Sequence, residues 1–247
     1  MKNNFINEFE LPKNFYDLNK QKEVEINKEY LYEFSLSLKN IFSKEELIFL
    51  TNHIKNEIKW IPVGIDGILR NYKEGDKIGS YRASFYEEKL ANSIWLRIKK
   101  SFPEIRKMKD NTPTNWDNSY FWQPIGVNPL FRLIKYKENC KLIPHYDDSY
   151  IKNNDIRTLS SFIIYLTTNE TGKTRFLKDK QINLDLKDRN YKDQFFTPTK
   201  NDILKNYRAI KNTGLIFDHR LLHDSEELIN EEKVIIRTDI LYRRLYD

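Results

Sequence analysis

From about Asn128 to the C-terminus, the sequence is a series of short segments rich in β-branched and aromatic residues, separated by turn-forming stretches. Such side chains fit a pleated, half-buried surface, so each segment is expected to form a strand. Several short strands that follow a helical region predict a β-sandwich or jelly roll supported by helices. The expected strands are Phe131–Tyr136, Leu159–Leu166, Thr174–Leu177, Gly214–Phe217 and Val234–Tyr242.

Two amphipathic helices are expected before these strands. Ser43–Lys59 opens with a Ser-x-x-Glu capping box and continues with Leu47, Leu50, Ile54 and Ile58 at helical spacing. The second helix covers Glu87–Ser101 and ends before the helix breaker Pro103. We therefore expect an α+β, mainly β chain, with a helical extension and support region in residues 1–125 and a β core in residues 126–247, together forming one structural domain. The polar stretch Asp179–Asn206 is expected to be a long loop.

The composition limits the classes of function. The 42 basic and 36 acidic residues give a net charge of +6 but are interspersed, which is typical of a solvated surface and does not predict a nucleic-acid interface. The single cysteine, Cys140, excludes an internal disulfide and a thiolate metal cluster. No stretch approaches the roughly 18 consecutive apolar residues of a membrane span, and the first ten residues lack the apolar run of a signal peptide. A cytoplasmic protein without membrane contact is expected.

Only four histidines occur, so each can be weighed separately. His53 lies among polar residues of the first expected helix and is assigned no role. His145 precedes Asp147 by two residues, and in an extended segment both side chains point to the same side and can reach one ion. By itself this spacing is common. A distal histidine, His223 or its rival His219 four residues earlier, would complete a set of three ligands.

Two imidazoles and one carboxylate leave three positions of a metal ion open. This set suits Fe(II) that also binds a bidentate 2-oxo acid and O2. Zinc would normally take a fourth ligand or hold a single water, and no further Cys or His with suitable spacing is present.

The stretch from Pro129 to Arg243, nearly half of the chain, resembles the catalytic domain of prolyl 4-hydroxylase-type 2-oxoglutarate oxygenases, which are built on a double-stranded β-helix (a jelly-roll, cupin-like fold). The resemblance is carried by a Tyr-containing strand, Phe131–Tyr136, before the His-x-Asp motif, and by Tyr165-Leu166 followed by a turn with Gly172, Thr174 and Phe176. Two departures occur in that turn: the family's paired glycines are reduced to Gly172, and Lys173 replaces a frequent acidic residue. By this resemblance the distal metal ligand is His223.

The resemblance implies an Fe(II)- and 2-oxoglutarate-dependent hydroxylase that uses O2 on an unactivated C–H bond and releases succinate and CO2. It places Tyr136 and Thr174 near the 2-oxoglutarate. The family's basic residue for the distal carboxylate corresponds by spacing to Lys233, ten residues after His223. Arg237 lies on the same side of the strand, because the two residue numbers differ by four, and its rigid fork suits a carboxylate better. Arg237 is preferred and both are kept.

The main substrate is not defined by the sequence motifs. A peptidyl residue such as proline is the first expectation, and a free amino acid or another small metabolite is the second. Asp148, Tyr150, Arg132 and Trp122 flank the motif and are expected to border the substrate cleft. Two alternatives stay open: a nucleic-acid demethylase of the same superfamily and a non-catalytic, metal-binding cupin-like module.

Overall fold

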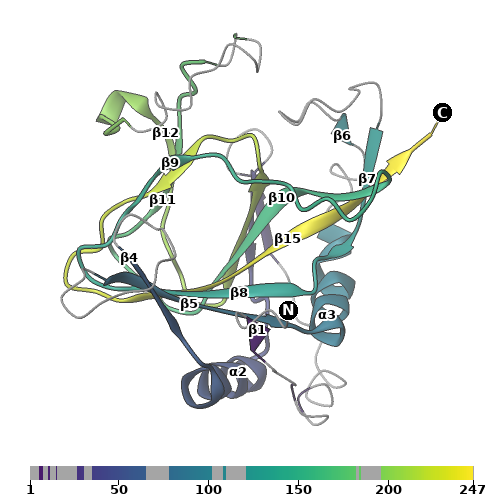
Figure 1. Cartoon of the computed structure of the whole chain (residues 1–247), viewed down its shortest axis with the longest axis horizontal. Helices are drawn as coiled ribbons and strands as arrows, with labels where there is room; N and C mark the ends of the chain where they lie inside the picture. Colours follow the sequence, from purple (N-terminus) through teal and green to yellow (C-terminus); the bar gives the residue numbers. More distant parts are fainter. Residues whose placement is uncertain are drawn as a thin grey trace.

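The chain folds into two facing β-sheets with helices on the outer side of the larger one (Figure 1). The structure is a computed structural model that describes residues 6–7, 11, 15, 27–30, 35–64, 78–101, 108–109, 121–181, 184 and 196–246. In the view of Figure 1, α2 lies beneath the larger sheet, α3 lies at its right near β7, and the smaller sheet lies at the upper left.

The major sheet has eleven strands. Its main path runs β1-β5-β8-β15-β10-β13-β3-β2, while β4 pairs with β5, and β6 joins through β7 to β15. All described pairings in this sheet are antiparallel except the pairing of β1 with β5. The strands are β1 (Ile6–Asn7), β2 (Asn27–Tyr30), β3 (Ser35–Lys39), β4 (Ile61–Gly64), β5 (Ile78–Tyr86), β6 (Met108–Lys109), β7 (Phe121–Val127), β8 (Leu130–Tyr136), β10 (Ile156–Tyr165), β13 (Thr213–Asp218) and β15 (Lys233–Leu245).

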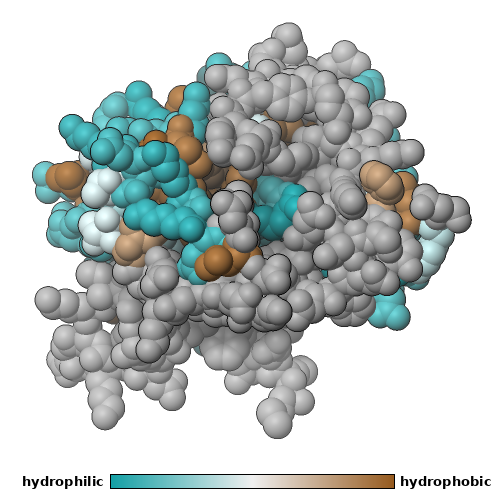
Figure 2. Space-filling model, turned by 90° about the horizontal axis from the view of Figure 1, so that it is seen from above, coloured by the Kyte–Doolittle hydropathy of each residue, from teal (hydrophilic) through white to brown (hydrophobic). Residues whose placement is uncertain are grey.

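The minor sheet has four antiparallel strands in the order β12-β11-β14-β9. Figure 2 looks onto the molecule from this side, and the described part of that face is mainly hydrophilic with isolated hydrophobic residues. The strands are β9 (Leu142–His145), β11 (Thr174–Leu177), β12 (Ile203–Tyr207) and β14 (His223–Ser225).

The helices begin where the sequence predicts. In α2 (Lys44–Glu57) the capping box is formed: the Glu46 amide donates to Ser43 Oγ at 3.1 Å, and the Ser43 amide donates to Glu46 Oε2 at 2.8 Å. In α3 (Glu88–Ile98) the cap is Glu87, whose carboxylate accepts from the Lys89 amide, and the 3-10 helix η1 (Lys99–Ser101) extends its end. Both helices predicted from the sequence are confirmed.

The major sheet is packed on both faces. Strand β8 alternates: Phe131 and Leu133 enter a core shared with α2 and α3, whereas Ile134 and Tyr136 enter a second core between the two sheets. Because each face is buried against a different layer, a shift of one residue in the register of β8 would exchange the two sets of side chains. This alternation fixes which residues face the space between the sheets.

The five predicted strands are present as β8, β10, β11, β13 and β15, with ends that differ by up to three residues. Strands β3, β4, β5 and β7 were not predicted. In β5 the inner face carries Arg82 and Ser84, so its sequence lacks the apolar alternation that identifies a strand. The division at residue 125 stays a prediction, although β7 spans it and β5 pairs with β8 across it.

The prediction of one long loop over Asp179–Asn206 is wrong at its C-terminal end. The 3-10 helix η5 (Lys200–Asp202) and the first part of β12 lie there. Strand β12 is an edge strand whose middle residues are exposed, so it lacks the buried apolar side chains that would mark it in the sequence. Residues 182–183 and 185–195 of that stretch lie outside the described residues.

None of the described helices is both long and apolar enough to cross a membrane.

We predict that Glu46→Gln lowers the free energy of unfolding by about 3 kcal/mol, because it leaves a largely buried guanidinium without its charged partner. The Glu46 carboxylate is fully buried and accepts from Arg97 Nη1 at 2.8 Å and from Nη2 at 2.6 Å, which ties α2 to α3. Urea denaturation measures the change. Glu45→Gln, on an exposed position of the same first turn, is the matched control and should change the free energy by less than about 0.5 kcal/mol. Equal effects of the two substitutions would contradict this role of Glu46.

Candidate metal centre

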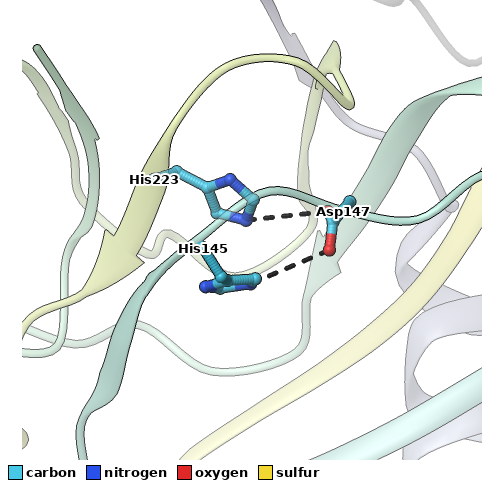
Figure 3. A group of neighbouring side chains, drawn as sticks. All are labelled: His145, Asp147 and His223. Carbon is cyan, nitrogen blue, oxygen red and sulfur yellow. Dashed lines mark ion pairs between the residues drawn. The ribbon is translucent and has the colours of Figure 1, made fainter. Parts of the chain in front are cut away.

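Three side chains converge where β9 meets β14. His145 at the end of β9 pairs directly across the ladder with His223 at the start of β14, and Asp147 follows β9 by two residues. Figure 3 shows both imidazoles turned toward the Asp147 carboxylate. Nε2 of His145 lies 3.7 Å from Asp147 Oδ1, and Nε2 of His223 lies 3.6 Å from Asp147 Oδ2. One ligand atom from each residue lies within 4.8 Å of the other two.

The tautomers of both histidines follow from their second ring nitrogen. Nδ1 of His145 lies 2.8 Å from the Ile143 carbonyl oxygen, and Nδ1 of His223 lies 2.9 Å from the Leu221 carbonyl oxygen. A carbonyl only accepts, so each Nδ1 carries the proton and each Nε2 presents a lone pair. Two lone pairs and a carboxylate thus face one point, and hydrogen bonds from Nδ1 to carbonyls are typical of metal-binding histidines.

The local electrostatics keep His223 and Asp147 in the form that binds a cation. Burial lowers the pKa of His223 to about 3, so its imidazole is neutral near pH 7. Burial alone would raise the pKa of Asp147, but the positive charge of Arg237, 2.8 Å from the carboxylate, holds that pKa well below its usual range. An ionised carboxylate beside a neutral imidazole is the protonation state that metal coordination requires.

Arg237 and Ser161 fix the orientation of the carboxylate. Arg237 Nη2 lies 2.8 Å from Asp147 Oδ1, and the Ser161 hydroxyl donates to Oδ2. Burial alone would lower the pKa of Arg237, but Asp147 and Asp239 raise it, so the guanidinium stays charged. The sequence singled out Arg237 but gave no indication of Ser161, because a serine in a buried apolar strand carries no motif.

One side of the three-residue centre opens into a cavity of about 710 Å³ between the sheets, and all three residues line it. Within the part of the chain that the structure describes, no fourth His, Cys, Asp or Glu joins the group. A centre with three protein ligands on one side and an open cavity on the other fits Fe(II) with exchangeable positions better than a structural zinc site, which four protein ligands close.

A buried ammonium group lies on the wall of the same cavity. Lys233 Nζ donates to the Gly172 carbonyl and to Ser225 Oγ, both at 2.6 Å, and it lies 4.9 Å from the centre of the Tyr136 ring. Gly172 adopts φ +66°, and a Cβ there would lie 2.6 Å from Leu228 Cδ2, so the single glycine of this turn is required. Burial lowers the pKa of Lys233 to about 8.

Thr174 and Tyr136 lie near this ammonium group on the cavity wall, where the sequence placed the co-substrate pocket. Thr174 Oγ1 is 2.8 Å from the hydroxyl of Tyr165, which also lines the cavity and was not predicted as a site residue. Burial raises the pKa of Tyr136 to about 12 and raises that of Tyr165 further, so both phenols keep their protons and remain hydrogen-bond donors.

The other predicted residues divide into two groups. Arg132, Asp148 and Tyr150 line the cavity. Trp122 does not: it is buried in the outer core, with the Arg157 guanidinium 4.2 Å above its ring, so the prediction that it borders the cleft is wrong. Trp122 was predicted because it precedes the His-x-Asp motif in the sequence. It lies on β7, which pairs with the C-terminal end of β15, away from the centre.

The rival ligand His219 lies outside the three-residue centre. Its Nε2 is 3.5 Å from Asp239, and its Nδ1 is 3.4 Å from Ser149 Oγ. His219 precedes β14 by four residues, whereas His223 is the β14 residue that pairs with β9. The fourth histidine, His53, lies on α2, with its ring stacked on Phe49.

No protein-family model and no curated protein matches this sequence. Among solved structures, that of OsALKBH1 aligns with a TM-score of 0.51 at 12% identity and covers 86% of this chain and 99% of that one. The viral collagen prolyl hydroxylase vCPH from Paramecium Bursaria Chlorella virus-1, in complex with 2OG, aligns at 0.46 and 17% identity, covering 87% and 97%. A Pseudomonas putida prolyl-4-hydroxylase aligns at 0.47 and 10% identity, covering 86% and 93%. The likeness to OsALKBH1 shows a shared fold, and the predicted double-stranded β-helix with supporting helices is confirmed.

We predict that His223→Ala or Asp147→Ala lowers the affinity for Fe(II) or Mn(II) by more than about 100-fold. Loss of a hydrogen bond to a metal ligand already lowers metal affinity by roughly 10- to 100-fold, and loss of the ligand itself should lower it further. Each substitution removes one of only three converging ligand atoms. Anaerobic calorimetric titration with either metal measures the affinity. His53→Ala is the matched control and should bind as the wild type does; unchanged affinity in either ligand variant would remove that residue from the centre.

Proposed function

We propose that the protein is an Fe(II)- and 2-oxoglutarate-dependent oxygenase that uses O2 to hydroxylate an unactivated C–H bond, with succinate and CO2 as co-products. The observation that carries the proposal is the pairing of an open three-ligand centre, His145, Asp147 and His223, with a buried ammonium on the wall of the same cavity. A dicarboxylic 2-oxo acid is the ligand that can use both, because one end can chelate a metal while the other end needs a cation.

We assign the distal carboxylate of 2-oxoglutarate to Lys233 in preference to Arg237. The preference for Arg237 in the sequence analysis rested on the fork of its guanidinium, but Arg237 already contacts Asp147 at 2.8 Å. An ammonium has three donors, and the two 2.6 Å bonds of Lys233 leave one N–H for a ligand. The phenols of Tyr136 and Tyr165 and the hydroxyl of Thr174 line the cavity near it and supply neutral donors.

When bound, Fe(II) with 2-oxoglutarate activates O2 for attack on a C–H bond. The protein contributes position and charge. Arg237 and Ser161 hold Asp147 in one orientation, so the carboxylate keeps the same position when ligands exchange at the open side. Ile134, Ile163 and Ile235 line the cavity with apolar surface, which limits the water that competes for the open side.

The main substrate is proposed to be a small metabolite, a free amino acid or a peptidyl residue that enters the same cavity. Asp148, Tyr150 and Arg132 are the predicted substrate residues that line it. Proteins of one fold act on many different substrates, so the residues that line the cavity, and not the fold, determine the substrate.

The direct test is to mix the protein with Fe(II) and 2-oxoglutarate under anaerobic conditions and to record the visible spectrum. We predict a visible absorption band from chelated 2-oxoglutarate, followed by succinate release after O2 is admitted. His145→Ala, Asp147→Ala and His223→Ala should lack both signals, and His53→Ala should keep both. A colourless wild-type mixture that releases no succinate would contradict the proposal and favour a non-catalytic metal-binding module.

We predict that the affinity for 2-oxoglutarate falls as pH rises above about 8 in the Mn(II)-loaded protein. Lys233 carries its positive charge below its pKa of about 8 and loses it above that pH, so the 2-oxoglutarate dianion then loses its counter-ion. The affinity should fall by up to about tenfold per pH unit. In Lys233→Arg the guanidinium stays charged throughout this range, because the pKa of an arginine is above about 12. The affinity of this variant for 2-oxoglutarate should therefore change little between pH 7 and pH 9, roughly one unit on either side of the pKa of Lys233. Calorimetric titration over this range measures both proteins. Parallel pH profiles for the two proteins would exclude Lys233 as the carboxylate partner.

A further inference from the structure

Two guanidinium groups on the wall of the cavity have no role in the proposed binding of the metal or of 2-oxoglutarate. Arg82 lies on β5 and Arg132 on β8, and both half-buried side chains line the cavity. They project from the inner face of the major sheet, the same face that carries Arg237 on the neighbouring strand β15. Their charge is therefore directed into the space that the substrate would occupy.

The sheet register places these groups beside each other and beside the metal centre. Arg132 pairs directly with Arg237 of β15 on one side and with Ser84 of β5 on the other. Arg82 pairs with Ile134, so it is the diagonal neighbour of Arg132. Diagonal neighbours on one face lie about 7–8 Å apart, within reach of two long side chains on one small ligand.

In the described part of the chain, neither guanidinium is held in an ion pair, although the charge of Arg132 is one of several that lower the pKa of the buried Asp239. No residue of the described ranges forms a hydrogen bond or an ion pair with Arg82 or Arg132, and Nε of Arg82 is buried without an acceptor. Other arginines of the chain are paired, such as Arg97 with Glu46 and Arg175 with Asp224. Adjacent like charges on a sheet destabilise it, and half-buried charges are normally compensated, so this pair is expected to have an external anion as its partner.

The other charges of the cavity do not supply that anion. Asp147 is paired with Arg237, and Asp224 accepts from Arg175 at 2.8 and 2.5 Å. With Lys233 assigned to 2-oxoglutarate, the charged residues of the cavity wall that remain are Arg82, Arg132 and Asp148. The two arginines and one aspartate give this remaining part of the wall a formal charge of +1.

We propose that the main substrate carries a carboxylate or phosphate group and that Arg82 and Arg132 bind this group. The inference rests on the proposed function, because it identifies a second ligand of the cavity that would also hold 2-oxoglutarate. The anion has to enter the cavity, since both side chains are on its wall, and a volume of about 710 Å³ is in the range of small-molecule pockets. The substrate class is therefore an anionic small molecule, and a neutral peptide segment does not supply the missing charge.

The test uses the full chain loaded with Mn(II) and 2-oxoglutarate, titrated calorimetrically with methyl phosphate and with acetate, and with acetamide as the neutral match. We expect at least one anion to bind and acetamide not to bind. Arg132→Gln and Arg82→Gln should each weaken that binding by about 10- to 100-fold, the range for loss of a hydrogen bond to a charged group. The anion that binds more tightly distinguishes a phosphate-bearing from a carboxylate-bearing substrate.

The matched control is Lys135→Gln, which removes one positive charge from the same strand, β8, at a residue that does not line the cavity and contacts Glu232 at 3.6 Å. It should bind the anion as the wild type does. A second readout is the affinity for 2-oxoglutarate, which should be unchanged in Arg132→Gln and Arg82→Gln. A lowered affinity for 2-oxoglutarate in either variant would overturn the assignment of that arginine to the main substrate.

Succinate release then compares charged compounds with their neutral partners, such as amino acids with their amides and nucleoside monophosphates with nucleosides. Stimulation by a charged member and not by its neutral partner supports the inference. It is overturned if neither anion binds, if the variants bind as the wild type does, or if neutral compounds or nucleic-acid strands alone stimulate release. The anaerobic absorption band with Fe(II) and 2-oxoglutarate shows which proposal is wrong. If the band is absent, the proposed oxygenase function is wrong; if the band is present, only the anionic substrate class is wrong.

Discussion

The structure depends on the register between β9 and β14. This register places His145 directly opposite His223, and the chain after β9 then brings the Asp147 carboxylate to the same point. Because both Nδ1 atoms donate to backbone carbonyls, three electron-pair donors face one another with no proton between the rings and the carboxylate. Such an arrangement is unfavourable without a cation, which makes metal binding the simplest explanation of the geometry.

The two faces of the major sheet divide structural and chemical roles. Its outer face is apolar and packs against α2 and α3, so it supplies the rigidity that holds the strands in register. Its inner face carries Lys233, Arg237, Arg132 and Arg82 at alternate positions of three neighbouring strands, β15, β8 and β5. Alternation along a strand thus brings cationic side chains of one rigid layer around one cavity. Site residues on such a scaffold keep their relative positions while ligands exchange.

Sequence alone predicted the parts of the fold that carry strong local patterns. The capping box at Ser43 and the apolar strands β8, β10, β13 and β15 were identified because their side chains repeat with the period of a helix or fill a buried strand. Strand β5 was missed because its inner face is polar, and β12 because most of it is exposed. In both strands polar or exposed side chains interrupt the apolar alternation that identifies a strand in the sequence.

The same limit applies to the site. The three converging residues were predicted from motif order, whereas the environment of each charge depends on residues far apart in sequence. Nothing local in the sequence shows that Arg237 contacts Asp147 or that Lys233 contacts the Gly172 carbonyl. Trp122 illustrates the opposite error, since it is near the motif in sequence but lies in the outer core. Pairing across strands, and not distance along the chain, determines which side chains share the cavity.

The most direct measurement of the central claim is a crystal structure of the protein with Mn(II) and 2-oxoglutarate, in which anomalous scattering locates the metal. We predict one ion that His145, Asp147 and His223 alone among the protein groups bind, with 2-oxoglutarate on its open side and the distal carboxylate at Lys233. An ion located elsewhere, or a fourth protein ligand that closes the coordination sphere, would contradict it.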